Sequence, residues 1–311
     1  MHLNLNKLSS ADGERRLGSA LASALAVVLD ANFPPAALSE VGDVLSKNNR
    51  SSRDGYDLET ICLEVLWEPT SVAKAARAFS TSLAAEITLT TPNLAELVAM
   101  AHSCGNRGSS SGATNYAPAE DACAEFAAKE SPAIEAAVAA AAASGNIKEL
   151  SSLLAPLLAP VVRYNMSSGH VRSRGIRVLL TLGAHGVVAA EQAEVDVCSG
   201  GASCAAAGVR AVWVRAVPLT DNGSAPHEVN VTGAGDTLTG AALWFLLHEN
   251  QSRIAANQPG GTFADAASFG AAAASSAVME LSAAVPKSLS RAGIVPYLIK
   301  RAEATPKSHL P

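Results

Sequence analysis

Strand-like and helix-like stretches alternate along most of this 311-residue chain, and the alternation restricts the folds it can form. Short apolar runs predict strands at 26–30, 61–67, 86–90, 177–182, 187–191, 209–217 and 228–231. Helices are expected from about residues 12, 71 and 93, and over 36–47, 234–248, 263–281 and 288–302. Such alternation builds right-handed βαβ units around a mostly parallel sheet. We therefore expect an α/β fold, a doubly wound sheet with helices on both faces.

The composition excludes several classes of function. Hydrophobic residues make up 49 % of the chain and aromatic residues only 4 %, which suits helices packed on a sheet. The net charge is −5 and no large basic cluster occurs, so nucleic acid is not an expected partner. The apolar run at 17–29 is interrupted by Gly18, Ser19 and Ser23 and is too short to cross a bilayer. We expect neither a membrane anchor nor a secretion signal.

The cysteines indicate a reducing compartment. Their number is odd and no pair has the spacing of a common zinc site: Cys62, Cys104, Cys123, Cys198 and Cys204. Free thiols are typical of the cytosol, so a cytoplasmic location is expected. The sequence does not indicate an oligomeric state.

Three stretches rich in polar or small residues interrupt the alternation. They cover 48–55, 103–121 and 196–208. We expect them to be surface loops with no chemistry of their own, inserted into one domain over residues 1–311.

The segment at 230–236 carries the strongest chemical signal. It reads Asn-Val-Thr-Gly-Ala-Gly-Asp, follows an expected strand and opens an apolar helix. Gly233 and Gly235 allow a tight turn, and the free N–H groups of a helix start attract an anion. Asp236 is then placed to take a proton from a hydroxyl that attacks a phosphate. The alternative is a glycine-rich turn in which Asp236 is an ordinary acid at a helix start.

A second motif, Thr91-Pro92-Asn93-Leu94-Ala95-Glu96, opens another helix. Asn93 is a good N-cap, and Glu96 three residues later is placed for a capping box. Both residues also offer the hard oxygen atoms that Mg²⁺ prefers. The sequence leaves the structural and the metal-binding interpretations open.

A third motif, Thr181-Leu182-Gly183-Ala184-His185-Gly186, joins two expected strands. Its two glycines allow a turn close to a ligand, although a plain hairpin is the alternative. Polar residues also follow the earlier strands, namely Asp30-Ala31-Asn32 and the segment from Glu68 to Lys74. The carboxyl ends of parallel strands are where open α/β sheets bind ligands. Glu68 and Lys74 could equally form a structural ion pair.

These motifs, in this order, closely resemble those of the ribokinase-like (PfkB) family of carbohydrate kinases. The D-T-x-G-A-G-D signature matches 230–236, with Asn230 in place of the first Asp. The P-N-x-x-E and T-x-G-x-x-G patterns match 92–96 and 181–186, and the resemblance extends from about Val27 to Val285. The Glu-Pro-Thr-Ser-x-x-Lys sequence at 68–74 is most similar to the pseudouridine kinase branch.

The resemblance implies a role for each matching residue. Asp236 would be the catalytic base, and the anion hole would consist of Gly233, Ala234 and Gly235. Nucleotide contacts would come from Thr181, Gly183, Gly186 and Thr232. Asn93 and Glu96 would hold the water shell of the Mg²⁺ that accompanies ATP. The resemblance also allows a monovalent cation as a further cofactor.

The resemblance has a gap at the N-terminus. Family members place a strand-rich region before the D-x-N strand, with an early acid, a Gly-Gly hinge and a β-sheet lid, whereas this chain reaches Asp30 almost at once. Its Gly-Gly pairs, at 200–201 and 260–261, come too late to be that hinge. We therefore expect a ribokinase-like, partial domain whose N-terminal substrate and lid region is missing.

Two functions of different classes follow from these motifs. The first is ATP-dependent phosphoryl transfer to a hydroxyl of a small sugar or nucleoside, as in pseudouridine kinases. The alternative is a truncated, non-catalytic nucleotide-binding remnant of such a kinase. A Rossmann dehydrogenase fits less well, because no G-x-G-x-x-G follows the first strand.

Overall fold

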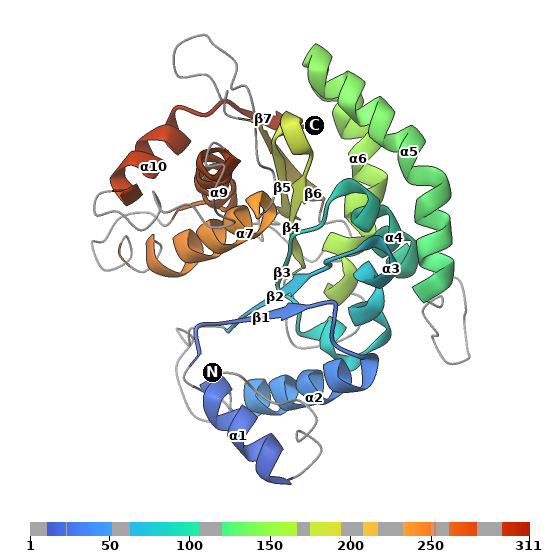
Figure 1. Ribbon diagram of the computed structural model, residues 1–311, viewed down its shortest axis with the longest axis vertical. Coiled ribbons are helices and arrows are strands. Elements are labelled where there is room, and N and C mark those ends of the chain that lie inside the picture. The colour runs from blue at the N-terminus through green and yellow to red at the C-terminus, as the bar shows by residue number, and fades with distance from the viewer. Residues whose placement is uncertain are drawn as a thin grey trace, which may run out of the picture. The chain divides into compact units, whose positions relative to one another are not determined.

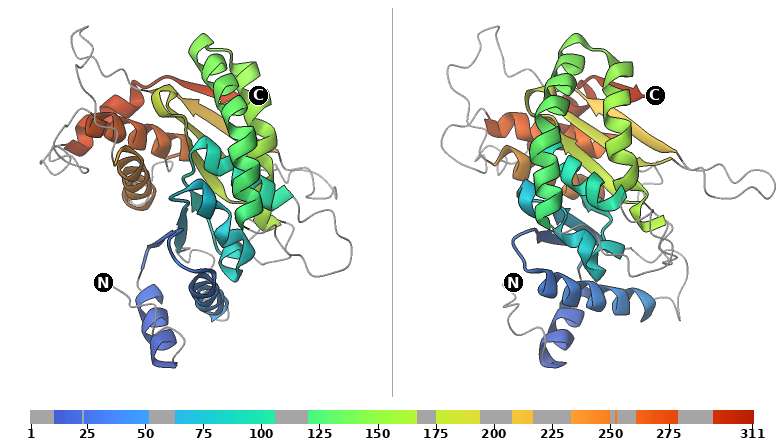
Figure 2. Two further views of the ribbon diagram at one scale, coloured as in Figure 1. Left: turned by 45° about the vertical axis from the view of Figure 1, so that its right-hand side comes forward. Right: turned by 90° about the vertical axis from the view of Figure 1, so that its right-hand side faces the viewer.

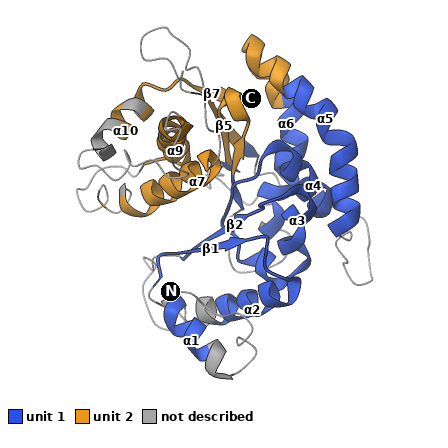
Figure 3. Ribbon diagram, viewed as in Figure 1, with its two compact units in different colours: residues 1–138, 152–178, 191–209 blue, residues 139–151, 179–190, 210–311 orange. Residues whose placement is uncertain are grey.

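The computed structural model of the protein describes residues 11–22, 24–51, 63–105, 120–166, 175–193, 208–216, 233–249, 252, 261–278 and 294–311 (Figure 1). The chain divides into two compact units, in which distant parts of the sequence come together (Figure 3). Unit 1 comprises residues 1–138, 152–178 and 191–209, and unit 2 comprises residues 139–151, 179–190 and 210–311. The expectation of one domain over residues 1–311 stays a prediction.

The expected α/β fold is confirmed. Within the described residues the sheet has seven strands in the order β1-β2-β3-β4-β5-β6-β7. The strands are β1 (Ala26–Asp30), β2 (Glu64–Glu68), β3 (Leu89–Thr90), β4 (Arg177–Thr181), β5 (Val187–Gln192), β6 (Val209–Val214) and β7 (Lys307–Leu310). β1, β2, β3 and β4 pair in parallel in that order, whereas β6 and β7 are antiparallel, so the sheet is mixed. The strand expected at 228–231 lies outside the described residues.

Helices alternate with the strands along much of the chain. In the first half of the chain they are α1 (Ala11–Ala22), α2 (Pro35–Ser51), α3 (Val72–Ala75), α4 (Leu94–Gly105), α5 (Glu120–Ser144) and α6 (Ile147–Val162). In the second half they are α7 (Ala234–Trp244), the π-helical η8 (Phe245–Glu249), α9 (Phe263–Val278) and α10 (Ile294–Glu303). Short 3-10 turns are η2 (Arg77–Ser80), η3 (Ser82–Ala85), η5 (Tyr164–Met166) and η6 (Gly183–His185). None of the described helices has both the length and the apolar character that crossing a membrane requires.

Two of the three expected insertions begin inside helices. Residues 48–51 complete α2, residues 103–105 complete α4, and residues 120–121 begin α5. The parts at 52–55, 106–119 and 196–207 lie outside the described residues. Polar composition therefore does not mark the ends of these helices, because exposed helical turns also carry polar residues.

The core of unit 1 surrounds β2. Val65, Leu66 and Trp67 are fully buried, which is typical of a parallel strand covered on both faces. The indole N–H of Trp67 donates to the carbonyl of Ala75 at 3.2 Å, so this core also holds the segment that follows the strand. The packing fixes the carboxyl ends of β1, β2 and β3, where the polar motifs of unit 1 lie.

In unit 2, helix α7 packs against α9, and Figures 1 and 2 show the two helices side by side. Gly270 permits this close approach, because a Cβ at that position would lie 2.7 Å from the carbonyl oxygen of Leu238. The rings of Trp244 and Phe269 stack with their centroids 5.5 Å apart. These contacts with α9 fix the position of α7. The Gly-Ala-Gly-Asp motif lies at the start of this fixed helix.

Candidate functional site

Helix α7 begins at a glycine in a left-handed conformation. Gly233 has φ 76° and ψ 4°, and no side chain of the described residues caps the helix start. The first intrahelical bond runs from the N–H of Thr237 to the carbonyl of Gly233 at 2.9 Å. Gly235 is exposed, and a Cβ at this position would meet nothing within 4 Å. Uncapped N–H groups at such a helix start favour an anion.

Asp236 lies in this first turn and is exposed. Its carboxylate forms no hydrogen bond or ion pair with another described residue. The acid therefore does not cap its own helix, which is the structural use that a carboxylate has at this position. An open carboxylate beside an anion-binding helix start can accept a proton from a ligand hydroxyl.

Thr237 is a further candidate, which the sequence motifs did not single out. Its side chain is 8 % exposed, and its Oγ1 is buried without a hydrogen-bond partner among the described residues. A helical threonine commonly bonds to the carbonyl four residues earlier, but among the described residues the Gly233 carbonyl accepts a hydrogen bond from the Thr237 backbone N–H and none from its hydroxyl. A buried polar atom without a partner is rare and favours a bound ligand or water nearby. In the sequence, the position of Thr237 directly after Asp236 is the one feature that could have marked it as a candidate site residue.

The turn after β4 has a left-handed glycine at each end. Gly183 has φ 55° and Gly186 has φ 99°, conformations that other residues rarely adopt. The N–H of Leu182 donates to the Gly186 carbonyl at 2.8 Å and closes the turn. Gly183 is exposed and a Cβ there would meet nothing within 4 Å. Thr181, at the end of β4, is half-buried, whereas Thr232 lies outside the described residues.

Asn93 and Glu96 form the capping box of α4. The N–H of Asn93 donates to Glu96 Oε2 at 2.9 Å, and the N–H of Glu96 donates to Asn93 Oδ1 at 2.9 Å. Glu96 is buried, and this burial raises its pKa, against the lowering effect of the Asn93 hydrogen bond. The structural interpretation of this motif is therefore realised. It leaves Glu96 Oε1 outside the capping box.

The donor set around Glu96 fits Mg²⁺ only as a water-mediated contact. The described residues contain no group of three His, Cys, Asp or Glu side chains that could hold a metal by themselves. Mg²⁺ usually keeps several waters and takes one or two carboxylates together with phosphate oxygens. Oε1 of Glu96, which the capping box does not use, is the oxygen that would make such a contact, and a nearby cation would stabilise the charged form of Glu96.

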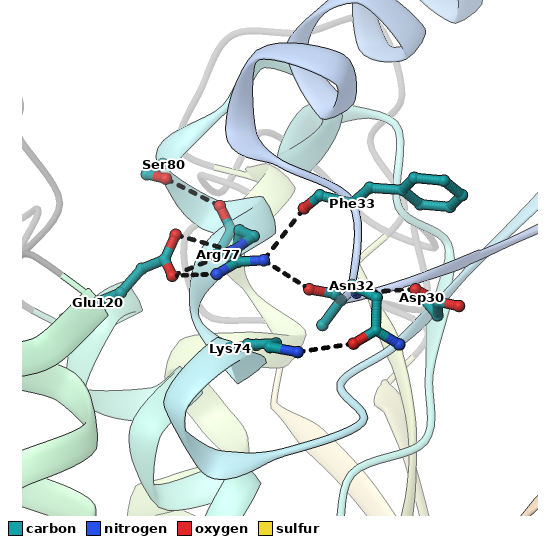
Figure 4. Close-up of polar contacts among 8 residues, drawn as sticks. Asp30, Asn32, Phe33, Lys74, Arg77, Ser80 and Glu120 are labelled. Carbon is teal, nitrogen blue, oxygen red and sulfur yellow. Dashed lines mark hydrogen bonds and ion pairs between the residues drawn. The ribbon is translucent and has the colours of Figure 1, made fainter. Parts of the chain in front are cut away.

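A second polar cluster occupies the carboxyl ends of β1 and β2 (Figure 4). Asp30 Oδ1 accepts the N–H of Asn32 at 2.7 Å, and Asn32 Oδ1 accepts a hydrogen bond from Lys74 Nζ at 2.6 Å. The ion pair between Glu68 and Lys74 that the sequence left open is absent from the described residues. The cluster thus presents a carboxylate, an amide and an ammonium group together. Such a mixture of acceptors and donors suits a ligand with several hydroxyl groups.

Arg77 holds the loop that carries this cluster. Its NH1 donates to the carbonyls of Ala31 and Phe33 at 2.8 and 3.2 Å, on either side of Asn32 (Figure 4). Its Nε and NH2 donate to the Glu120 carboxylate. Sequence patterns do not indicate this contact, because Glu120 belongs to a stretch that was expected to be a loop.

The turn between β2 and α3 is strained. Thr70 has φ 53°, a conformation that costs a β-branched residue on the order of 1–3 kcal/mol. Next to it, the N–H of Ser71 donates to the Pro69 carbonyl at 2.6 Å. The carboxylate of Glu68 accepts a hydrogen bond from the hydroxyl of Thr91, the residue that follows β3. Strain of this kind is found at ligand-binding sites, and here it lies beside Lys74.

The candidate residues fall into two groups, one in each unit. Unit 1 contains Asp30, Asn32, Lys74, Asn93 and Glu96. Unit 2 contains Thr181, Gly183, Gly186, Gly233, Ala234, Gly235 and Asp236. Within unit 1 the structure brings Asp30, Asn32 and Lys74 together, and within unit 2 it forms the uncapped helix start and the glycine turn.

Comparisons with known proteins find similarity at the level of structure. No family model and no curated protein matches the sequence. A carbohydrate kinase from Agrobacterium tumefaciens is similar with a TM-score of 0.47 and 17 % identity, over 99 % of this chain and 62 % of that one. Phosphofructokinase-2 from Escherichia coli, in complex with potassium, is similar with a TM-score of 0.39 and 16 % identity, over 93 % of this chain and 63 % of that one. The chain thus spans less than two thirds of their lengths, and at these identities the similarity is one of fold only.

Proposed function

We propose that this protein transfers the terminal phosphoryl group of ATP to a hydroxyl group of a sugar or nucleoside. The observation that carries the proposal is the start of α7, where an uncapped helix terminus lies beside an exposed carboxylate, Asp236. Phosphoryl transfer needs a site that stabilises negative charge and a group that orients or deprotonates the acceptor. This first turn offers both.

In this proposal the backbone N–H groups of residues 233–235 stabilise charge on the transferred phosphoryl group. Their orientation is fixed by the helix, so little reorganisation is needed during the reaction. Asp236 accepts the proton of the attacking hydroxyl, which becomes more nucleophilic as it approaches phosphorus.

The glycine turn at 183–186 is assigned to the nucleotide. Gly183 and Ala184 are exposed, so their backbone can approach a flat base or a ribose closely. Glu96, with Asn93 positioning its carboxylate, would hold the water shell of Mg²⁺. The metal, when bound, neutralises phosphate charge, and Glu96 contributes only a fixed, partly buried acceptor.

The acceptor is assigned to the cluster at the ends of β1 and β2. Asp30 and Asn32 can accept hydrogen bonds from ligand hydroxyls, and Lys74 can donate one to an oxygen atom. Ribose and pseudouridine both present such groups. The similarity of residues 68–74 to pseudouridine kinases supports pseudouridine as the first acceptor to test.

The second candidate function is nucleotide binding without transfer. It requires the glycine turn and the α7 helix start but makes no use of Asp236. The openness of the Asp236 carboxylate favours the kinase, since a binding protein has no need of a free acid beside a phosphate.

The proposal is tested with the purified chain, ATP carrying a label on its terminal phosphate, Mg²⁺, and a panel of pentoses, hexoses and nucleosides that includes pseudouridine. Label appearing in an acceptor product supports the kinase. Saturable binding of a non-hydrolysable ATP analogue without labelled product would select the binding protein. If a folded sample neither binds the analogue nor transfers the label, both functions are refuted.

A further inference from the structure

We infer that Trp213 is a positioning residue for the turn at 183–186, and that its indole N–H sets the affinity of this turn for nucleotide. The inference rests on the proposed function, in which the turn contacts the nucleotide. Trp213 lies on β6, outside every motif of the sequence analysis, and it reaches a segment that is 28 residues away in sequence.

The first supporting observation is the contact itself. Trp213 is 2 % exposed, and its Nε1–H donates to the carbonyl of His185 at 2.9 Å. The indole N–H is a donor only, and a buried donor requires a partner. Because the peptide unit is planar, fixing the His185 carbonyl also fixes the direction of the Gly186 N–H, which donates to Gly183 at 3.2 Å. One hydrogen bond from β6 therefore controls the conformation of the turn.

The second observation is the close packing of the turn on β6. A Cβ at Gly186 would lie 2.1 Å from the Val214 carbonyl oxygen and 2.6 Å from the Ala216 nitrogen. At the other end of the turn, a Cβ at Gly183 would meet nothing within 4 Å. The turn thus has a side fixed on β6 and a side that is open to a ligand.

The indole ring is itself held in place. The guanidinium group of Arg215 lies 4.8 Å from the centre of the Trp213 ring, within the range of a cation–π contact. The ring therefore has little freedom to follow the turn if the turn moves. A ligand on the open side meets backbone groups that are already oriented, which reduces the entropic cost of binding.

The test removes the indole N–H of Trp213 and keeps an aromatic ring at this position. Trp213→Phe removes the N–H while retaining an aromatic ring, and a non-hydrolysable ATP analogue is titrated by calorimetry and by tryptophan fluorescence. We expect the analogue to bind about tenfold more weakly, because the His185 carbonyl loses its fixed direction. The fluorescence change that accompanies binding in the unmodified protein should be lost.

Trp67→Phe is the matched control. Trp67 is also fully buried, and its indole N–H also donates to a backbone carbonyl, that of Ala75 at 3.2 Å. Trp67 lies in unit 1, so this variant should lose stability but keep both the affinity and the fluorescence response. A second variant places 3-benzothienylalanine at position 213, which preserves the ring shape and exchanges only the N–H for sulfur. It should weaken binding as Trp213→Phe does.

The outcomes separate this inference from the proposed function. If the unmodified protein binds the analogue and both position-213 variants bind equally well, the inference is overturned and the proposed function stands. Equal weakening by Trp67→Phe would also overturn it, because the effect would then be one of general stability. Absence of binding by the unmodified protein would overturn the proposed function, and the inference with it.

Discussion

Arg77 and Glu120 connect two segments that lie 43 residues apart, with Arg77 Nε 2.9 Å from Glu120 Oε1 and NH2 2.8 Å from Oε2. The hydrogen bonds that Arg77 donates to Glu120 raise the pKa of Arg77. The remaining nitrogen of Arg77 holds the carbonyls on both sides of Asn32. The geometry of the polar cluster at the ends of β1 and β2 therefore depends on an ion pair with the start of α5.

Replacing Arg77 by Lys should lower the free energy of unfolding by about 1–2 kcal/mol, because an ammonium cannot bind the carboxylate in a bidentate manner and two carbonyls as well. Chemical denaturation measures the change. Arg163→Lys is the control, since Arg163 is exposed and its side chain forms no hydrogen bond or ion pair with another described residue. Equal stability of Arg77→Lys and the unmodified protein would contradict this account of the loop.

The effect of Glu96→Gln separates the metal and capping roles of this residue. The Gln side chain can still accept the Asn93 N–H, so the stability should change by less than about 1 kcal/mol. The Mg²⁺ concentration needed for nucleotide binding should rise about tenfold, because the charge is lost. Glu149→Gln is the control, as Asn146 and Glu149 form a similar capping contact at the start of α6. A large fall in melting temperature with an unchanged Mg²⁺ response would leave Glu96 a capping role alone.

The pH dependence of stability provides another test of Glu96. Burial raises its pKa in the folded state, so the folded protein binds this proton more tightly than the unfolded chain does. The contribution of the Glu96 carboxyl group to the free energy of unfolding is fully present below its pKa in the unfolded chain. This contribution is lost as the pH rises through its pKa in the folded protein. Gln does not titrate, so Glu96→Gln should gain stability relative to the unmodified protein as the pH rises from about 4 to about 7. Urea denaturation of both proteins across this pH range measures the gain. A difference in free energy of unfolding that does not change with pH would refute a raised pKa of Glu96 in the folded protein.

Sequence motifs a few residues long predicted the starts of α4 and α7, which depend on interactions between neighbouring residues. The capping box at Asn93 and Glu96 was one of the two interpretations that their spacing allowed, and α7 begins directly after the glycine that the motif placed there. Both features arise from residues within a few positions of one another.

Contacts between distant segments could not be read from the sequence in this way. The bond from Trp213 to His185 and the ion pair of Arg77 with Glu120 are set by tertiary packing. β7 was not expected, because Lys-Ser-His-Leu has no apolar pattern, and its ladder with β6 makes it a strand. The helix expected from residue 71 is a single turn followed by 3-10 turns.

Replacing Lys74 by Met tests the acceptor cluster. The Met side chain keeps the apolar stem but removes the ammonium group that bonds to Asn32. The KM for the acceptor should rise about tenfold while the affinity for an ATP analogue is unchanged. Lys148→Met is the control, because Lys148 is exposed at the start of α6. A parallel loss of nucleotide affinity would contradict the assignment of Lys74 to the acceptor.

The central claim is that Asp236 accepts the proton of the attacking hydroxyl. The most direct measurement compares Asp236→Asn with the unmodified protein in two assays, transfer of labelled phosphate to the best acceptor and binding of a non-hydrolysable ATP analogue. Asn preserves the size of the side chain and removes its basicity. The account predicts that turnover falls by about a hundredfold or more while the dissociation constant of the analogue stays within about a factor of two. Undiminished transfer by Asp236→Asn would contradict it.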